Sequence, residues 1–296
     1  MNELETTLRC GDGTNIFVHA WTTADSEPER VLVCIQGLGG HGGYYEVLAE
    51  QLTPTGTLVV AADLRGHGRS EGTRGDIDRF DRYLEDIQAT ITWVCTRWPA
   101  LPIVLLGESM GASIAIQYLA SGLHGAEIAG LVLVSPVLRP TIHPSMREVA
   151  RFMRSLLTAP SRPSIAVTGR EELGCRDHAF NDRLRADPLF VRHVSVRFLN
   201  SLTTWLRQTR RKASSVRHPI LILQGAQDYI AHPLGTSRFL RQIATSQRQQ
   251  HLVTFPEAYH CLLYDPATPA VMQELAAWLV AYSARVDAEC VDAKIG

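Results

Sequence analysis

The sequence predicts an α/β fold: a doubly wound, mostly parallel sheet with helices on both faces and a helical cap insertion. Short apolar runs alternate with longer helical patterns along the 296 residues, as in parallel strands joined by helices. One interval between two apolar runs is far longer than such a connection needs. We therefore expect one large α/β domain that is interrupted once.

Six short runs are the predicted parallel strands. Five are almost wholly apolar, as expected of strands buried on both faces of a sheet, and the last is more polar. They are Val31–Ile35, Leu58–Ala62, Ile103–Leu106, Leu131–Val134, Ile220–Leu223 and Gln250–Phe255. Ahead of them, Thr6–Arg9 and Asn15–Trp21 flank a Gly-Asp-Gly turn, which favours an antiparallel hairpin.

Helical patterns fill most intervals between these strands. They cover Tyr44–Leu52, Phe80–Trp98, Met110–Ser121, Ser237–Ile243 and Ala270–Ala284. The exception is the interval of roughly eighty residues between Ser135 and Ile220, in which helical patterns at 146–157 and 191–208 are interrupted by prolines. We therefore divide the chain into an α/β core, residues 1–138 and 217–296, and a helical cap (lid) insertion, residues 139–216.

Composition and charge limit the classes of function. A hydrophobic fraction of 45%, a charged fraction of 20% and a formal net charge of −1 describe an ordinary globular protein and give no support for nucleic-acid binding. No apolar run approaches the roughly 20 residues of a membrane span, and the first residues do not resemble a signal peptide, so a cytoplasmic location is expected. The six cysteines are scattered without metal-ligand spacing, so no metal site is expected.

The stretch Gly107-Glu108-Ser109-Met110-Gly111 predicts a nucleophile. It joins a predicted strand to a predicted helix, so Ser109 is expected on a tight strand-to-helix turn. Such a turn forces the backbone of the serine into an unfavourable conformation, and side chains two positions either side would collide with the strand and the helix. Glycines at 107 and 111 meet that requirement, although a plain Gly/Ser turn is the alternative.

An acid and a histidine follow Ser109 at the carboxyl ends of later predicted strands. Asp228 comes after the strand at 220–223, and His260 comes after the strand that ends at Phe255. In an open α/β sheet, ligands gather at the carboxyl ends of the strands, so the three side chains are expected to converge there. Ser109 would attack an acyl carbon, His260 would carry the proton, and Asp228 would orient the imidazole.

Other histidines, acids and thiols fit these roles less well. Two histidines precede Ser109, a third lies too close to Asp228, the cysteine beside His260 is better explained by packing, and one aspartate lies beyond His260. These residues are His41, His67, His232, Cys261 and Asp265. The stretch Asp63–Ser70 is better explained as a structural turn in which the Asp and Arg side chains fix the loop.

Five motifs occur in an order that matches a known superfamily. They are Gly37–His41, Asp63–Ser70, the glycine-flanked Ser109, Gln224–Asp228 and His260. Together they resemble the α/β-hydrolase superfamily, and within it the monoacylglycerol lipase and lysophospholipase group of serine aminopeptidase S33-type hydrolases. The resemblance covers nearly the whole chain and implies an α/β-hydrolase fold and serine ester hydrolysis without a cofactor.

Ester hydrolysis also needs donors for the developing oxyanion, each supplying about 2.7 to 4 kcal/mol. We expect these donors to be the backbone N–H groups of Leu38 and Met110, because the glycines around Leu38 let its loop approach closely. The chain departs from the family at Gln36, where relatives usually carry histidine. Its amide can still donate a hydrogen bond that braces the loop.

The predicted cap is strongly basic. Residues 139–217 hold 15 arginines and one lysine against six acidic residues, a net charge of +10, while the rest of the chain carries −11. The cap could simply pair with an acidic core, or it could meet an anionic membrane surface as a peripheral contact, or steer an anionic substrate. Its apolar residues, such as Phe152 and Trp205, would suit an acyl chain or an ordinary helical core equally.

The sequence thus predicts a serine carboxylic ester hydrolase acting on a small lipid-like monoacyl ester, with monoacylglycerol ahead of lysophospholipid. A general carboxylesterase or thioesterase is an alternative within the same chemistry. A different class is a ligand receptor built on the same fold, since certain receptors retain the three residues. Sustained turnover would separate an enzyme from a receptor.

Overall fold

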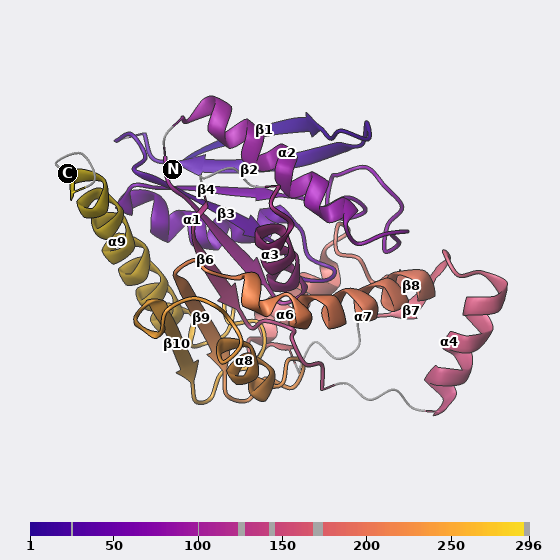
Figure 1. Ribbon diagram of the computed structural model, residues 1–296. Helices are drawn as coiled ribbons and strands as arrows, with labels where there is room; N and C mark the ends of the chain where they lie inside the picture. The colour runs from indigo at the N-terminus through magenta and orange to yellow at the C-terminus, as the bar shows by residue number, and fades with distance from the viewer. Residues whose placement is uncertain (25, 100, 124–127, 142–145, 168–173, 293–296) are drawn as a thin grey trace.

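The computed structural model describes residues 1–24, 26–99, 101–123, 128–141, 146–167 and 174–292. Its centre is an eight-stranded sheet in the order β1-β2-β4-β3-β5-β6-β9-β10 (Figure 1). β2 pairs antiparallel with β1 and with β4, and every neighbouring pair from β4 to β10 is parallel. The predicted doubly wound, mostly parallel sheet is confirmed.

All six predicted parallel strands and the hairpin are present. The strands of the large sheet are β1 (Asn2–Arg9), β2 (Asn15–Thr22), β3 (Arg30–Ile35), β4 (Thr57–Ala62), β5 (Ile103–Glu108), β6 (Ile128–Val134), β9 (Ile220–Gly225) and β10 (Gln250–Phe255). β1 begins four residues before the predicted Thr6, because its pairing with β2 continues as far as Asn2 opposite Thr22. The polarity of Asn2–Glu5 fits an edge strand that is mostly exposed.

Helices connect these strands as the alternation predicts. They are η1 (Gly42–Tyr45), α1 (Glu46–Leu52), η2 (Thr53–Thr55), α2 (Arg82–Arg97), α3 (Met110–Ser121), η3 (Ala213–Ser215), α8 (Pro233–Leu240), η4 (Gln247–Gln249) and α9 (Thr268–Asp292). The predicted start of α8 at Ser237 is wrong. Pro233 opens that helix, and the imidazole of His232 caps it by accepting from the N–H of Leu234.

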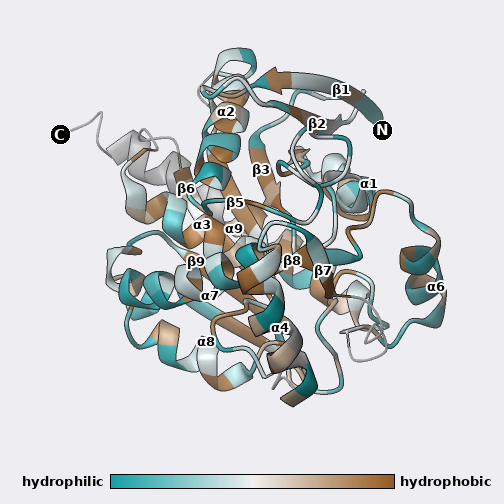
Figure 2. Ribbon diagram, turned by 90° about the vertical axis from the view of Figure 1, so that its right-hand side faces the viewer, coloured by the Kyte–Doolittle hydropathy of each residue, from teal (hydrophilic) through white to brown (hydrophobic). Residues whose placement is uncertain are grey.

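The sheet divides the core into two hydrophobic clusters. Val31, Val33 and Ile35 of β3 face the cluster that includes α2, α3 and α7, whereas Leu32 and Cys34 face the cluster that includes α1 and α9. Both faces of β3 are therefore buried, which explains its continuous apolar sequence. Hydrophobic residues are concentrated in these central strands (Figure 2).

The segment between β6 and β9 departs most from the sequence prediction. It contains α4 (Met146–Thr158), β7 (Pro163–Ala166), α6 (His178–Ala186), β8 (His193–Ser195) and α7 (Val196–Arg211). The predicted helix at 191–208 starts too early, because β8 pairs with β7 and Ser195 then caps α7 by accepting from the N–H of Phe198. α6 and this small sheet were missed.

We call residues 139–216 the cap segment, and their role as a separate lid stays a prediction. α4 lies at the edge of the molecule, away from the sheet (Figure 1). α7, in contrast, packs against α3, and its Trp205 belongs to the core cluster. Within the residues that the structure describes, no helix has both the length and the hydrophobicity that crossing a bilayer requires.

The loop after β4 is held by its own charged side chains, in agreement with the structural interpretation of Asp63–Ser70. The carboxylate of Asp63 accepts from the N–H of Gly42 and of Arg69, each at 2.6 Å. The guanidinium of Arg65 donates to the buried carboxylate of Asp86 from two nitrogens, at 2.8 and 2.6 Å. This loop therefore anchors the residues that follow β3.

His67, in the same loop, should make the stability of the protein depend on pH. Burial lowers the pKa of His67 to about 4. Between about pH 6.5 and pH 4 the unfolded chain therefore binds a proton that the folded chain does not, so the free energy of unfolding should fall by about 1.4 kcal/mol per pH unit as the solution is acidified. Urea unfolding at pH 7 and pH 5 measures this loss.

The control is His67→Asn, whose amide can still donate to the carbonyl of Arg65, which the Nδ1 of His67 faces at 3.2 Å. Because Asn does not titrate, its loss of stability between pH 7 and pH 5 should be smaller than that of the wild type by about 2 kcal/mol. Equal losses in the two proteins would contradict the assignment to His67.

Candidate active site

Ser109 lies on a strained turn between β5 and α3. Its φ of 55° and ψ of −112° are unfavourable for any residue other than glycine. A Cβ atom on Gly111 would lie 2.1 Å from the carbonyl oxygen of Ile35, and one on Gly107 would lie 2.6 Å from the Cα of Ala112. Both glycines are needed for this close packing, as the sequence predicts.

The structure brings the three predicted side chains together. The Nε2 atom of His260 lies 2.8 Å from the Oγ of Ser109, and its Nδ1 atom lies 2.9 Å from the Oδ2 of Asp228. His260 is 7% exposed and Asp228 is 5% exposed, so the bond between them is shielded from competing water, whereas the bond to Ser109 is only partly buried. The result is a continuous hydrogen-bond chain from the hydroxyl to the carboxylate.

Asp228 is held in place by three further donors. Its Oδ1 accepts from the N–H of Ile230 at 2.8 Å and of Ala231 at 2.7 Å, and its Oδ2 accepts from the amide of Gln224 at 3.0 Å. Both oxygens of the carboxylate are therefore held, and Oδ2 is shared between Gln224 and His260. With Nδ1–H donating to this carboxylate, Nε2 is left to accept the hydroxyl proton of Ser109.

The loop after β3 approaches the same turn. A Cβ atom on Gly37 would lie 3.1 Å from the Cβ of Ser109, so the loop that carries Leu38 passes beside Ser109. Gln36 donates from Nε2 to the carbonyl of Gly40 at 2.5 Å, so it braces the loop as expected. Among the described residues, neither the N–H of Leu38 nor that of Met110 donates a hydrogen bond. These two groups could stabilise a negative oxygen beside Ser109.

The chain matches the serine aminopeptidase S33 family over residues 26–267, which includes the nucleophile turn, Asp228 and His260. It belongs to this family of α/β-hydrolases. The resemblance that the five motifs indicate is thereby confirmed.

Several proteins similar to this chain are lipases. The monoacylglycerol lipase of Mycolicibacterium smegmatis is 28% identical over 275 residues, 91% of this chain and 94% of the relative. The human monoglyceride lipase is 29% identical over 278 residues, 90% and 88% of the two chains. A soluble variant of the monoglyceride lipase of Saccharomyces cerevisiae, solved with a substrate analogue, superposes with a TM-score of 0.81 at 20% identity, over 94% and 96% of the chains.

The last likeness shows the fold alone, while the family match and the two lipase relatives bear on the chemistry. The present chain is thus an S33-family serine hydrolase of the lipase and esterase type. Its ester substrate is a separate question.

The competing side chains of this S33 hydrolase have other partners. His41 lies 3.0 Å from the carboxylate of Asp187, far along the chain in the cap segment. Asp265 accepts two hydrogen bonds from the guanidinium of Arg176, at 3.0 and 2.5 Å. His232 caps α8, as described above. These contacts agree with the choice of Asp228 and His260 over the alternatives.

Glu108 is a titratable group beside the nucleophile that the sequence interpretation did not use. Its Oε2 accepts from the hydroxyl of Tyr45 at 3.0 Å. Desolvation raises the pKa of this carboxyl, while the bond from Tyr45 and the nearby His260 oppose the rise. No spacing in the sequence marks this pair, because its members lie 63 residues apart.

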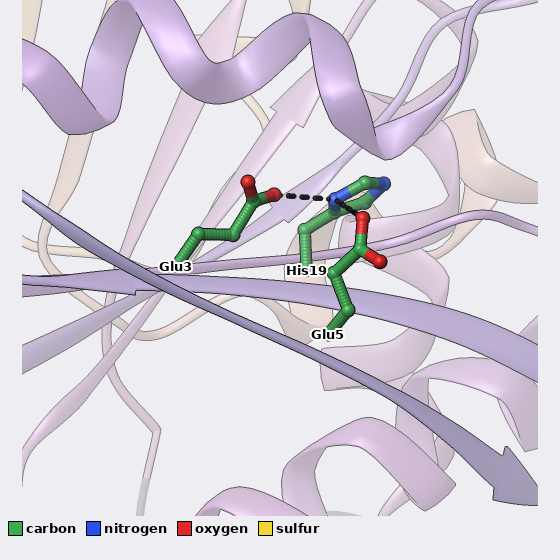
Figure 3. A group of neighbouring side chains, drawn as sticks. All are labelled: Glu3, Glu5 and His19. Atoms are coloured by element: carbon green, nitrogen blue, oxygen red, sulfur yellow. Dashed lines mark hydrogen bonds and ion pairs between the residues drawn. The ribbon is translucent and has the colours of Figure 1, made fainter.

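A second cluster has the residue types of a metal site but lies on the β1–β2 hairpin (Figure 3). The Nδ1 of His19 lies 3.0 Å from an oxygen of Glu3 and 3.9 Å from an oxygen of Glu5. That oxygen of Glu5 also accepts from the guanidinium of Arg69 at 2.6 Å. Ion pairing within the protein accounts for the cluster, which shares no strand with Ser109.

Cys261 should not act as a nucleophile although it follows His260. Desolvation raises the pKa of its thiol well above the ordinary value, so the thiolate is scarce at neutral pH. Treatment with iodoacetamide at pH 7.5 should therefore leave ester hydrolysis unchanged, and Cys261→Ala should keep at least half of the wild-type kcat. Rapid inactivation that Cys261→Ala prevents would show that the thiol is reactive.

Proposed function

We propose that this protein hydrolyses monoacyl lipid esters, monoacylglycerol before lysophospholipid, through an acyl-enzyme on Ser109. The observation that carries the proposal is the hydrogen-bond chain of Ser109, His260 and Asp228 at 2.8 and 2.9 Å. The names of the similar lipases support the choice of a monoacylglycerol. Lysophospholipid hydrolysis and general carboxylesterase or thioesterase activity use the same chemistry and are the alternatives.

In the first half-reaction, the Oγ of Ser109 attacks the carbonyl carbon of the ester while Nε2 of His260 takes the hydroxyl proton. The N–H groups of Leu38 and Met110 donate to the oxyanion that develops. The bond between the acyl carbon and the alcohol oxygen then breaks, and His260 gives its proton to the leaving alcohol. Asp228 stabilises the imidazolium that exists between the two proton transfers.

In the second half-reaction, water replaces the alcohol. His260 takes a proton from the water as its oxygen attacks the acyl carbon, and the same two N–H groups receive the negative charge. The bond between the acyl carbon and Ser109 breaks, and the proton returns to the Oγ atom. Fatty acid leaves, and no cofactor takes part in either step.

Replacing the nucleophile and the base should test this chemistry directly. Ser109→Ala and His260→Ala should each lower kcat for monooleoylglycerol by at least about a thousandfold, because each removes the activated nucleophile. The double variant should lose little more than either single variant, since residues that act as a unit are not additive. A fluorophosphonate probe should label the wild type at Ser109 and leave Ser109→Ala unlabelled.

Labelling at another serine, or full activity of Ser109→Ala, would end the proposal. The number of turnovers decides between an enzyme and a receptor, because a receptor would release at most one slow equivalent of fatty acid. Parallel assays with lysophosphatidylcholine and with p-nitrophenyl esters of two to sixteen carbons rank the alternatives. Faster turnover of lysophosphatidylcholine than of monooleoylglycerol would reverse the stated order of substrates.

We propose in addition that the cap segment contacts an anionic lipid surface. Two sets of its basic residues differ in their partners. Arg197 and Arg176 pair with the core carboxylates of Asp76 and Asp265. A second group is exposed and forms no ion pair with a described carboxylate; it consists of Arg207, Arg210, Arg211 and Lys212, and we call it the α7 basic cluster.

α4 supports the same proposal through its apolar side chains. Those that are exposed lie at positions i, i+3, i+7, i+10 and i+11, which form one face of the helix. They are Met146, Val149, Met153, Leu156 and Leu157, and the first and last are 84% and 82% exposed. A helix with such a face is suited to lie in a lipid interface, where a lipase finds its substrate.

Reversing charge in the α7 basic cluster should weaken binding to vesicles. Arg207→Glu with Arg211→Glu should reduce binding to phosphatidylglycerol-rich vesicles at least about thirtyfold at low salt, because each basic residue near such a surface contributes about 1 kcal/mol. Wild-type binding should fall between low salt and 0.15 M, where the Debye length is about 8 Å. Hydrolysis of p-nitrophenyl butyrate should stay unchanged, since this soluble substrate needs no interface. Flotation with vesicles measures the binding.

The matched control is Arg9→Glu with Arg97→Glu, which makes the same change of charge at exposed positions of the core. It should leave binding within about twofold of the wild type. A third variant, Met153→Ser with Leu157→Ser, tests the apolar face of α4 and should also weaken binding. Salt-independent binding, or none at any content of anionic lipid, would remove the proposal of a membrane contact.

A further inference from the structure

The segment that follows α6 lies on the loop that carries Leu38. The N–H of Val191 donates to the carbonyl of Gly39 at 2.9 Å. The ring of Phe190 lies so close that a Cβ atom on Gly39 would be 2.7 Å from its Cζ. Gly39 has a φ of 89°, which also favours glycine. Both the backbone conformation and the closeness of Phe190 therefore require glycine at this position. The cap segment therefore touches the residue next to Leu38 directly.

Asp187, the residue that follows α6, forms a second contact between the cap segment and the loop after β3. Its Oδ2 accepts from the hydroxyl of Tyr44 and lies 3.0 Å from Nε2 of His41. Its Oδ1 accepts from the N–H of Leu189 at 2.7 Å. Partial burial alone would raise the pKa of Asp187, but the hydrogen bonds from Tyr44, Leu189 and His41 outweigh burial and lower it. The side chain is thus a carboxylate at neutral pH.

Tyr44 is suited to be a permanent donor. Burial, together with its bond to Asp187, raises the pKa of the phenol well above its ordinary value, so the hydroxyl keeps its proton. The tyrosine belongs to η1, which begins directly after the loop at Gly42. A fixed Tyr44 therefore fixes the end of the loop.

The loop needs such anchors because it is rich in glycine. Five of the seven residues from 37 to 43 are glycines, whose backbone has more freedom to lose than that of any other residue. The core supplies two restraints, from Gln36 to Gly40 and from Asp63 to Gly42. Just after the loop, the hydroxyl of Tyr264, also from the core, donates to the carbonyl of Tyr44. The cap segment adds further restraints through Val191 and Asp187.

We propose that Asp187 is a positioning residue for ester hydrolysis: it holds His41 and Tyr44, and so fixes the N–H of Leu38 at the distance that the oxyanion requires. The inference rests on the proposed function, in which Leu38 is an oxyanion donor. A displaced donor weakens the transition state more than the bound ester, because the full negative charge exists only after attack. Loss of Asp187 should therefore lower kcat and spare KM.

The experiment compares Asp187→Ala, Asp187→Asn and the wild type with p-nitrophenyl butyrate. For Asp187→Ala we expect kcat to fall about tenfold or more, with KM within about twofold. Asp187→Asn should fall less, since its amide oxygen can still accept from Tyr44. The affinity for an alkyl trifluoromethyl ketone, which forms an oxyanion on the serine, should fall by the same factor as kcat/KM.

The matched control is Arg197→Gln, which breaks a different ion pair between the cap segment and the core, with Asp76. It should lower the thermal unfolding temperature without changing kcat or ketone affinity. Tyr44→Phe removes only the hydroxyl that binds Asp187 and serves if Asp187→Ala does not fold. It should change kcat and ketone affinity in the same direction as Asp187→Ala.

Three results would overturn the inference while the proposed function stands. They are an unchanged kcat in Asp187→Ala or in Tyr44→Phe, a rise in KM alone, and a fall in kcat without a fall in ketone affinity. Equal kinetic losses in Arg197→Gln would also overturn it, because the effect would then be general loosening of the cap segment. A wild-type protein that hydrolyses no ester would refute the proposed function, and the inference with it.

Discussion

The close contact between the first turn of α3 and the end of β3 is the constraint on which the site depends. Gly111 approaches the carbonyl of Ile35 so closely that only a missing side chain allows it. This contact forces the chain through a sharp turn and holds Ser109 at a positive φ, a conformation that costs of order 1 to 3 kcal/mol. The buried faces of β5 and α3 offset that cost. The hydroxyl is thereby presented above the sheet, where His260 reaches it.

The sequence predicted what local sterics and chain order determine. Strands such as β3 and β5 are buried on both faces, so their apolar runs are continuous, and the glycines around Ser109 follow from one turn. Asp228 and His260 were found because each follows a strand. The β7–β8 pair and the bond from Asp187 to Tyr44 could not be found in this way, since they depend on contacts between distant segments. α6 was missed although Asp177 carries a capping signal. The start of α8 was missed although Pro233 and His232 carry a capping signal.

Some positively charged side chains of the cap segment pair with core carboxylates, and others are exposed. Arg197 and Arg176 neutralise the core carboxylates of Asp76 and Asp265, whose side chains are 2% and 0% exposed. Removing one partner of such a pair leaves an uncompensated buried charge, so these arginines are part of the fold. The α7 basic cluster is exposed, and charges of this kind contribute little to stability. Pairing with an acidic core, one of the interpretations that the +10 count allowed, therefore applies to Arg197 and Arg176, while the contact of the α7 basic cluster with an anionic surface stays a proposal.

The charged hairpin at the edge of the sheet also affects how copies of the protein meet. β1 is an edge strand, and such a strand offers unpaired backbone groups to any extended chain that approaches. Glu3 and Glu5, which gather around His19, stand on this strand and are largely exposed. A second strand laid against β1 would bring its own side chains beside these carboxylates and remove part of their water, which opposes pairing. The cluster that has the residue types of a metal site thus also places negative charge on the exposed edge strand, one of the features by which natural proteins disfavour edge-to-edge pairing.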